Sequence, residues 1–231
     1  MKARARGKAM TLTRAMLAAA SLTLAAHISV GAAASSPDLT DLLTRYNARI
    51  AKTLETIQTL RAEQEMVEPQ ADGTSKRADA VLSYTKGQDL TRDEIFSDLS
   101  YPAGDYTLET LVGPRLDPLE YTVALVGMED MGGHACYRLS LTALKRDVKH
   151  IDGTVWISAE AFAPVRIQAS VADPPYPATE IKLDKSFEPD PSGVWLLRSH
   201  AGEVEVKLMW ARKRGVRHIT YDDYVVTTAG P

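Results

Sequence analysis

The feature that most constrains the fold is a series of short segments, from Glu120 onward, in which apolar and polar residues alternate. A two-residue period places the apolar side chains on one face of a β-strand and the polar ones on the other. Four clear segments are 121–125, 135–143, 164–171 and 204–210. Further strands fill the intervals between these segments, so the loops that join successive strands are too short for the crossover helices that parallel strands need. The pattern therefore predicts a largely antiparallel sheet with one apolar and one polar face.

Further segments bring the expected total to about nine or ten strands. Residues 60–66 and 78–84 alternate in the same way, and the turn-forming run Glu68–Gly73 between them predicts a hairpin. The run Gly127–Gly133 is expected to be a turn as well. The remaining expected strands are 154–158, 179–187, 194–200 and 217–227.

An amphipathic helix is expected ahead of the sheet, with Ser36 as N-cap, Pro37 at the first helical position and Asp38 in the first turn. A short helix is predicted after Thr91, which has capping-box spacing to Glu94, and one further helical turn is expected around 106–111. The fold class is thus α+β and β-rich: a strongly curved antiparallel sheet covered by an N-terminal helix and short helices. The apolar face of the first helix consists of Leu39, Leu42, Leu43, Tyr46, Ile50 and Leu54.

The first 34 residues are typical of a cleavable signal peptide. The segment before residue 15 holds five basic and no acidic residues, and an almost unbroken apolar stretch, 15–30, follows it. Residues 31–34 (Gly-Ala-Ala-Ala) suit signal cleavage. The apolar stretch is shorter than the roughly 20 residues of a membrane-spanning helix, so a retained anchor is the less favoured alternative. We expect a periplasmic protein with a single domain, 35–231.

The charge balance argues against polyanionic partners. The chain has 27 basic and 30 acidic residues, a formal charge of −3. Loss of the five basic signal residues leaves 22 against 30, or −8. A mildly acidic protein is poorly suited to nucleic acid, so no nucleic-acid partner is expected.

The sequence contains no recognisable catalytic or metal-binding motif. Cys136 is the only cysteine, so an intrachain disulfide is impossible and a structural zinc site is not expected. His150, His200 and His218 lack the spacing of metal ligands. His134 and Cys136 would share one face of a strand, which permits a Cys–His nucleophile, although polar-face residues of an ordinary strand fit equally. We expect no catalytic residue, no metal and no cofactor, and the role of Cys136 stays open.

Aromatic residues accompany the predicted strands, and their role is open at this stage. They belong either to a filled core or to the lining of an apolar ligand cavity. The residues are Trp156, Trp195 and Trp210, together with Tyr84, Tyr121 and Tyr137.

Several segments resemble outer-membrane lipoprotein-sorting proteins of the LolA/LolB type. The segment 155–167 (VWISAEAFAPVRI) resembles their strand–turn–strand "W-[IV]-D…P-V-R" hairpin, and 127–139 resembles the hairpin before it. Residues 193–197 and 220–224 are similar to their late strands. The resemblance implies an incomplete β-barrel, lidded by helices, that shields acyl chains in the periplasm.

The resemblance also implies a function and a binding surface. We expect a monomeric carrier or binder of lipids, acylated proteins or other long apolar ligands, with envelope proteins as further possible partners. The alternatives are a non-catalytic protein-interaction or stress-sensing module on the same fold, and an enzyme that would use Cys136 or a histidine. The apolar ligand face is expected to consist of Leu60, Met66, Leu82, Tyr84, Tyr121, Tyr137, Leu139, Leu141, Val165, Ile167, Val204 and Leu208.

Overall fold

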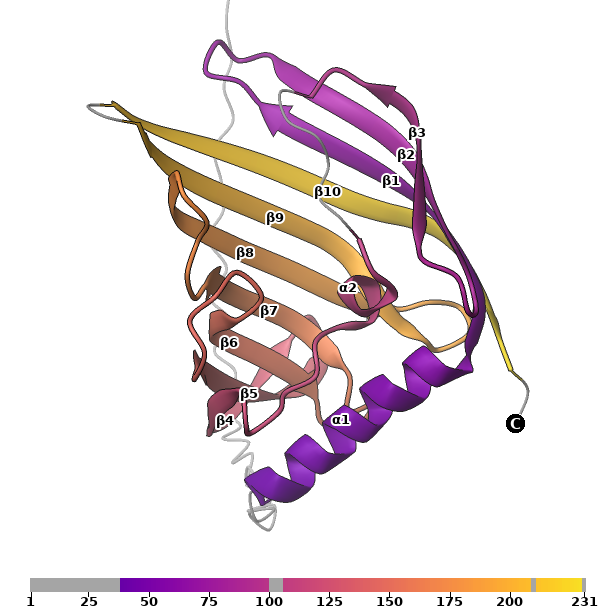
Figure 1. Cartoon of the computed structure of the whole chain (residues 1–231). Helices are drawn as coiled ribbons and strands as arrows, with labels where there is room; N and C mark the ends of the chain where they lie inside the picture. The colour runs from indigo at the N-terminus through magenta and orange to yellow at the C-terminus, as the bar shows by residue number, and fades with distance from the viewer. Residues whose placement is uncertain (1–37, 100–105, 209–210, 230–231) are drawn as a thin grey trace, which may run out of the picture. The chain divides into compact units, whose positions relative to one another are not determined.

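The described residues of the computed structural model, 38–99, 106–208 and 211–229, all belong to one compact unit. They form one helix, one short helix and an open sheet of ten strands (Figure 1). The predicted signal peptide lies outside the described residues. The elements are α1 (Leu39–Thr56), β1 (Ile57–Pro69), β2 (Ser75–Thr85), β3 (Thr91–Ser97), α2 (Leu108–Val112), β4 (Tyr121–Met131), β5 (His134–Ala143), β6 (Ile151–Ser158), β7 (Pro164–Val171), β8 (Ala178–Pro189), β9 (Trp195–Leu208) and β10 (Ala211–Thr228).

The strand order is β3-β2-β1-β10-β9-β8-β7-β6-β5-β4, and every neighbouring pair is antiparallel. The predicted antiparallel sheet is therefore confirmed. Nearly all neighbours are joined by short hairpins, but β1 pairs with β10 from the far end of the chain. The edges are β3 and β4, which follow each other in sequence. Their connection must consequently cross the whole width of the sheet, and α2 lies within it.

The two helices lie on the same side of the sheet (Figure 1). Asn47 connects α1 to the segment that follows α2. Its side-chain amide donates to the carbonyl of Leu116 at 2.9 Å and accepts from the Leu116 N–H at 2.8 Å. The hydroxyl of Tyr46 donates to the carbonyl of Pro114 at 2.8 Å. We call the side beneath α1 and α2 the helix-covered face, and the other side the open face.

The predicted helix face is the buried one. Leu42, Leu43, Tyr46 and Ile50 are buried against the sheet. The cap differs from the prediction: Asp38 itself is the N-cap and accepts from the Thr40 N–H at 3.2 Å. The other two residues of the predicted cap, 36 and 37, lie outside the described residues.

Three local predictions are wrong. The segment after Thr91 is strand β3, because its backbone pairs with β2, and this pairing outweighs the capping-box spacing. Gly127 is a bulge inside β4, which continues to Met131, so the turn is confined to Gly132 and Gly133. The two late strands expected at 194–200 and 204–210 are one continuous strand, β9, since its pairing with β8 runs throughout. The helical turn expected around 106–111 is confirmed as α2.

The faces are less uniform than the alternation predicted. Cys136 and Trp156 face the open side by register, because Trp156 lies opposite Arg166, yet both are buried. The Trp156 indole donates to the carboxylate of Glu129 on the strand β4. The open face is therefore polar over β7–β10 but partly packed at the β4–β6 end.

Candidate ligand-binding surface

The structure brings the predicted ligand residues together on the helix-covered face, where most of them are core. In the uninterrupted register across the sheet, Leu139 lies opposite Val155, Val155 opposite Ile167, and Met66 opposite Ile219. Leu60, Met66, Leu82, Tyr121, Leu139, Leu141, Val165 and Ile167 are buried, whereas Tyr84, Tyr137 and Val204 are half-buried. Leu208 ends β9, and its side chain lies outside the described residues.

One part of this face remains accessible. The hairpin end of β9 and β10 extends beyond both helices (Figure 1). On β8, Ile181 and Leu183 point to the helix-covered side, and Val204 lies opposite Ile181 on β9. Val206 follows Val204 on the same side, and all four side chains are half-buried. We call Ile181, Leu183, Val204 and Val206 the aliphatic strip.

Beside the aliphatic strip lies a group of polar side chains on the same face. We call it the polar cluster, and its register positions surround the buried Ile219. Gln64 lies opposite Tyr221, and Arg92 donates its Nε–H to the Gln64 side-chain oxygen at 2.8 Å. The members of the polar cluster are Gln64, Glu68, Arg92, Tyr106, Lys185, His200, Arg217 and Tyr221.

Two arginines of the polar cluster have acidic partners. Arg217 donates to the carboxylate of Glu68 from Nε at 2.9 Å and also from Nη2, and only 21% and 10% of the two side chains are exposed. Arg92 pairs with Glu94 at 2.9 Å. Burial raises the pKa of Tyr106, while the neighbouring Tyr221 and the charges of Arg92 and Arg217 oppose this rise.

The two remaining basic residues differ. Lys185 and His200 lie opposite each other on β8 and β9, within the row Ile167–Lys185–His200–Ile219. Burial lowers the pKa of Lys185. Burial, followed by the charges of Lys185 and Arg217, lowers the pKa of His200 to about 4, so its imidazole is neutral at pH 7.

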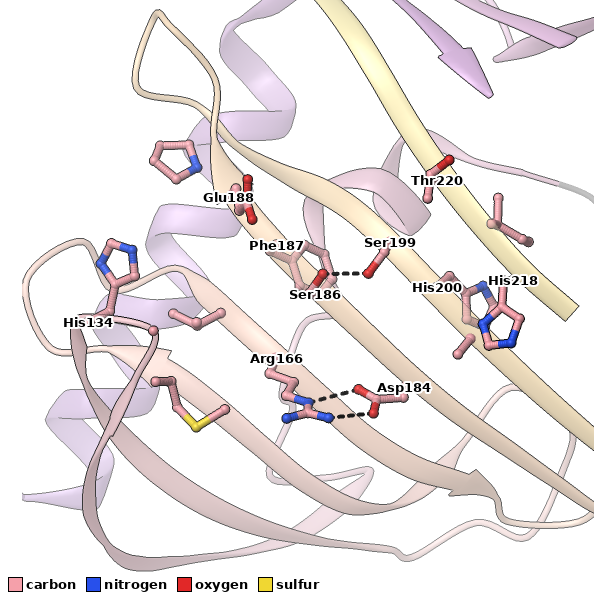
Figure 2. Close-up of a pocket in the computed structure, with 16 residues that line it drawn as sticks. His134, Arg166, Asp184, Ser186, Phe187, Glu188, Ser199, His200, His218 and Thr220 are labelled. Carbon is pink, nitrogen blue, oxygen red and sulfur yellow. Dashed lines mark hydrogen bonds and ion pairs between the residues drawn. The ribbon is translucent and has the colours of Figure 1, made fainter. Parts of the chain in front are cut away.

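The open face carries two adjoining hollows of about 660 and 560 Å³ that share Asp184, Ala201 and His218. Figure 2 shows the larger one, in which Arg166 and Asp184 point toward each other. The guanidinium donates to the carboxylate from Nε at 2.9 Å and from Nη2 at 2.6 Å. These hydrogen bonds lower the pKa of Asp184.

The polar groups of the larger hollow satisfy one another. Ser186 and Ser199 share a hydrogen bond of 2.6 Å between their hydroxyls, as the dashed line in Figure 2 shows. Among the described residues neither hydroxyl contacts an imidazole or carboxylate, which an activated serine nucleophile would need. The hollow is thus a polar surface with internally paired side chains.

The Cys–His arrangement conceived from the sequence does not form. The Cys136 thiol is buried and donates to the backbone carbonyl of His134 at 3.2 Å, whereas the His134 ring packs edge-on against Trp195. Burial, together with the negative charges of Asp130 and Glu129, raises the pKa of the thiol to about 11. A reactive thiol needs the opposite shift.

Two further titratable side chains that were considered for catalysis or metal binding, His150 and Asp222, are paired with neighbouring residues. His150 shares a hydrogen bond of 2.7 Å with Asp147, and Asp222 pairs with Arg198 at 2.6 Å. No group of three or more potential metal ligands occurs in the described parts of the chain. Within the same residues, no helix is long and apolar enough to cross a bilayer.

The predicted ligand residues omitted the polar cluster and three of the four residues of the aliphatic strip, Ile181, Leu183 and Val206. Ile181 and Leu183 alternate with polar residues, which could have revealed them. Lys185 continues the same alternation on the apolar face, and His200 takes an apolar-face position on β9. A basic residue at an apolar position of a predicted strand was the available signal.

No protein-family model and no curated protein matches the sequence. Among solved structures, the chain is similar to a DUF1329-family protein from Desulfovibrio piger (TM-score 0.46, 14% identity, covering 83% of this chain and 94% of that one). It is also similar to a candidate outer-membrane lipoprotein-sorting domain from Vibrio parahaemolyticus (0.46, 12%, 83% and 93%). A LolA-superfamily protein from Nitrosomonas europaea is a third (0.40, 13%, 80% and 94%).

Proposed function

We propose that this protein is a periplasmic carrier or binder of amphiphiles with long apolar chains, such as lipids and lipidated proteins. The aliphatic strip is the observation that supports the proposal. Aliphatic surface in contact with water costs about 25 cal/mol per Å², so a face used only for packing would end where its helices end. Here the apolar face continues past α2 into four half-buried side chains that a ligand chain can cover.

The buried ligand residues predicted from the sequence extend this site in the proposal. Residues such as Leu139 and Ile167 would contact the chain if α1 or the connection through α2 moves away from the sheet. Export through cleavage of 1–34 and a single domain over 35–231 belong to the same proposal.

The test is binding of a fluorescent long-chain fatty acid to the purified protein, combined with mass spectrometry of organic extracts. Val204→Asp places a charge in the aliphatic strip, and we expect it to weaken probe binding by about tenfold, equivalent to 1.4 kcal/mol. Val216→Asp is the matched control, because Val216 is half-buried on the open face of the same hairpin. Equal loss in both variants, or no binding by the wild type, would refute the proposal.

A second candidate function has its own observation. Both edge strands expose large apolar side chains: Ile95 and Phe96 on β3 are 72% and 51% exposed, and Met128 on β4 is 58% exposed. An open edge with apolar side chains is suited to pairing with a strand from a partner protein. Cross-linking of the purified protein to envelope proteins, lost in Phe96→Lys but retained in Val204→Asp, would favour an interaction module.

A further inference from the structure

Two basic side chains lie within the apolar face and have no acidic partner in the part of the chain that the structure describes. Lys185 and His200 are direct cross-strand partners, flanked in their row by Ile167 and Ile219, which are both buried. Lys185 forms no hydrogen bond or ion pair with any residue that the structure describes. The Nε2 of His200 is buried and likewise has no hydrogen-bond partner among these residues.

The nearest carboxylates are engaged elsewhere. Glu68, on the same face, accepts from Arg217. Asp184 adjoins Lys185 in sequence but projects to the open face, where Arg166 holds it. The other charged neighbour of His200 on this face is Arg217, which is paired with Glu68.

One further donor of the polar cluster favours a ligand that carries hydrogen-bond acceptors. The Nη2 of Arg92 is buried, and the described residues supply no acceptor for it. Nearly all buried polar groups in proteins are hydrogen-bonded, and an unsatisfied one is destabilising. A surplus of donors on one face therefore fits a ligand that is rich in acceptors.

We propose that Lys185 and His200 bind the anionic group, a phosphate or carboxylate, of an amphiphile whose apolar chain lies along the aliphatic strip. This inference rests on the proposed function. Leu183 of the strip precedes Lys185 by two residues on the same face of β8, and Val204 follows His200 by four on β9. The anionic group and the chain of one molecule can thus contact adjacent positions. Lys185 is only half-buried, which leaves it reachable for such a ligand.

The test compares four probes by calorimetry on the purified full chain: dodecyl phosphate, dodecanoate, uncharged dodecanol and inorganic phosphate. Lys185→Met removes the charge and keeps the length of the side chain. We expect this variant to bind dodecyl phosphate and dodecanoate about tenfold more weakly, because it lacks the charged hydrogen-bond donor. Dodecanol should bind equally to both proteins. Lys182→Met is the matched control, since Lys182 lies on the open side of the same strand and pairs with Glu180.

Two further readouts separate binding from folding. Removal of a half-buried ammonium that has no partner among the described residues should raise the Tm of the Lys185→Met protein, whereas a structural role of Lys185 would lower it. His200→Gln keeps a hydrogen-bond donor and should retain most of the affinity for dodecyl phosphate. His200→Leu has no donor and should bind dodecyl phosphate severalfold more weakly.

The outcomes distinguish the two proposals. If the wild type binds none of the three dodecyl probes, the proposed function fails. If all three bind equally and Lys185→Met changes nothing, the proposed function stands and the anion subsite is refuted. If inorganic phosphate binds as tightly as dodecyl phosphate and depends equally on Lys185, the assignment to an amphiphile is overturned in favour of free phosphate.

Discussion

The two faces of β7–β10 are built from alternate residues of the same strands, yet they differ in how their charged side chains are paired. On the open face, Arg166 and Asp184 neutralise each other in a geometry that water can reach. On the helix-covered face, one row away in the register, Lys185 and His200 are desolvated and have no acidic partner among the described residues. The Arg166–Asp184 pair on the open face is thus neutral, whereas Lys185 and His200 on the helix-covered face have no such counter-charge among the described residues. The difference indicates that binding chemistry should be sought beneath and beside the helices.

The largest expected effect on the free energy of unfolding concerns helix α1, which covers the apolar face of the sheet. Tyr46→Ala removes a fully buried ring of α1 and its hydrogen bond to Pro114. We expect a loss of about 3–5 kcal/mol in the free energy of unfolding, measured by urea denaturation, because a large cavity forms beneath the helix. Lys52→Ala on the exposed side of α1 is the control and should change it by less than about 0.5 kcal/mol. A similar small loss for Tyr46→Ala would show that α1 contributes little to the core.

The next prediction compares how much a glutamate–arginine ion pair stabilises the fold on each of the two faces. Glu68→Gln leaves the Arg217 guanidinium without its carboxylate in the helix-covered face, and we expect a loss of about 3 kcal/mol in unfolding free energy. Glu203→Gln breaks the pair with Arg214 on the open side of the β9–β10 hairpin, where the arginine is 65% exposed. That loss should stay below about 1 kcal/mol. Equal losses would contradict the distinction between the faces.

The alkylation rate of Cys136 reports whether the β4–β6 end of the open face is packed. A thiol pKa of about 11, against the ordinary 9.0, reduces the thiolate fraction at neutral pH by about 100-fold. We expect alkylation by iodoacetamide to be slower by at least this factor in the native protein than in urea, as followed by mass spectrometry. Rapid alkylation of the native protein would reopen the interpretation of Cys136 as a nucleophile.

The smallest effect is the pH dependence of the open-face pair. The pKa of Asp184 is lowered in the folded protein, mainly by its hydrogen bond to Arg166, so it stabilises the fold above its ordinary value of 3.8. This contribution is lost as the pH falls through the lowered value. Since the aspartate is 38% exposed, Asp184→Asn should cost less than about 1 kcal/mol at neutral pH. Denaturation curves of the variant and wild type should converge in acid, and a difference that persists there would assign the effect to packing.

Much of the local structure was predictable because its causes are local. The alternation in β5 and β7 identified both strands and the sides of Leu139 and Ile167. The helical spacing of Leu42, Tyr46 and Ile50 identified the buried face of α1. The same reasoning failed at Thr91–Ser97, where a capping-box spacing competes with pairing to β2. It also failed to anticipate the burial of Trp156 on the open side.

The sequence by itself determined the antiparallel β class, the N-terminal helix and the side on which most apolar residues lie, because strand and helix periods act over a few residues. Only the tertiary structure decided that β1 pairs with β10, that β3 and β4 are the two edges, and that the connection through α2 crosses the sheet between them. These arrangements depend on contacts between residues far apart in the chain, which no local period encodes. The same long-range pairing places Lys185 beside His200 on the helix-covered face.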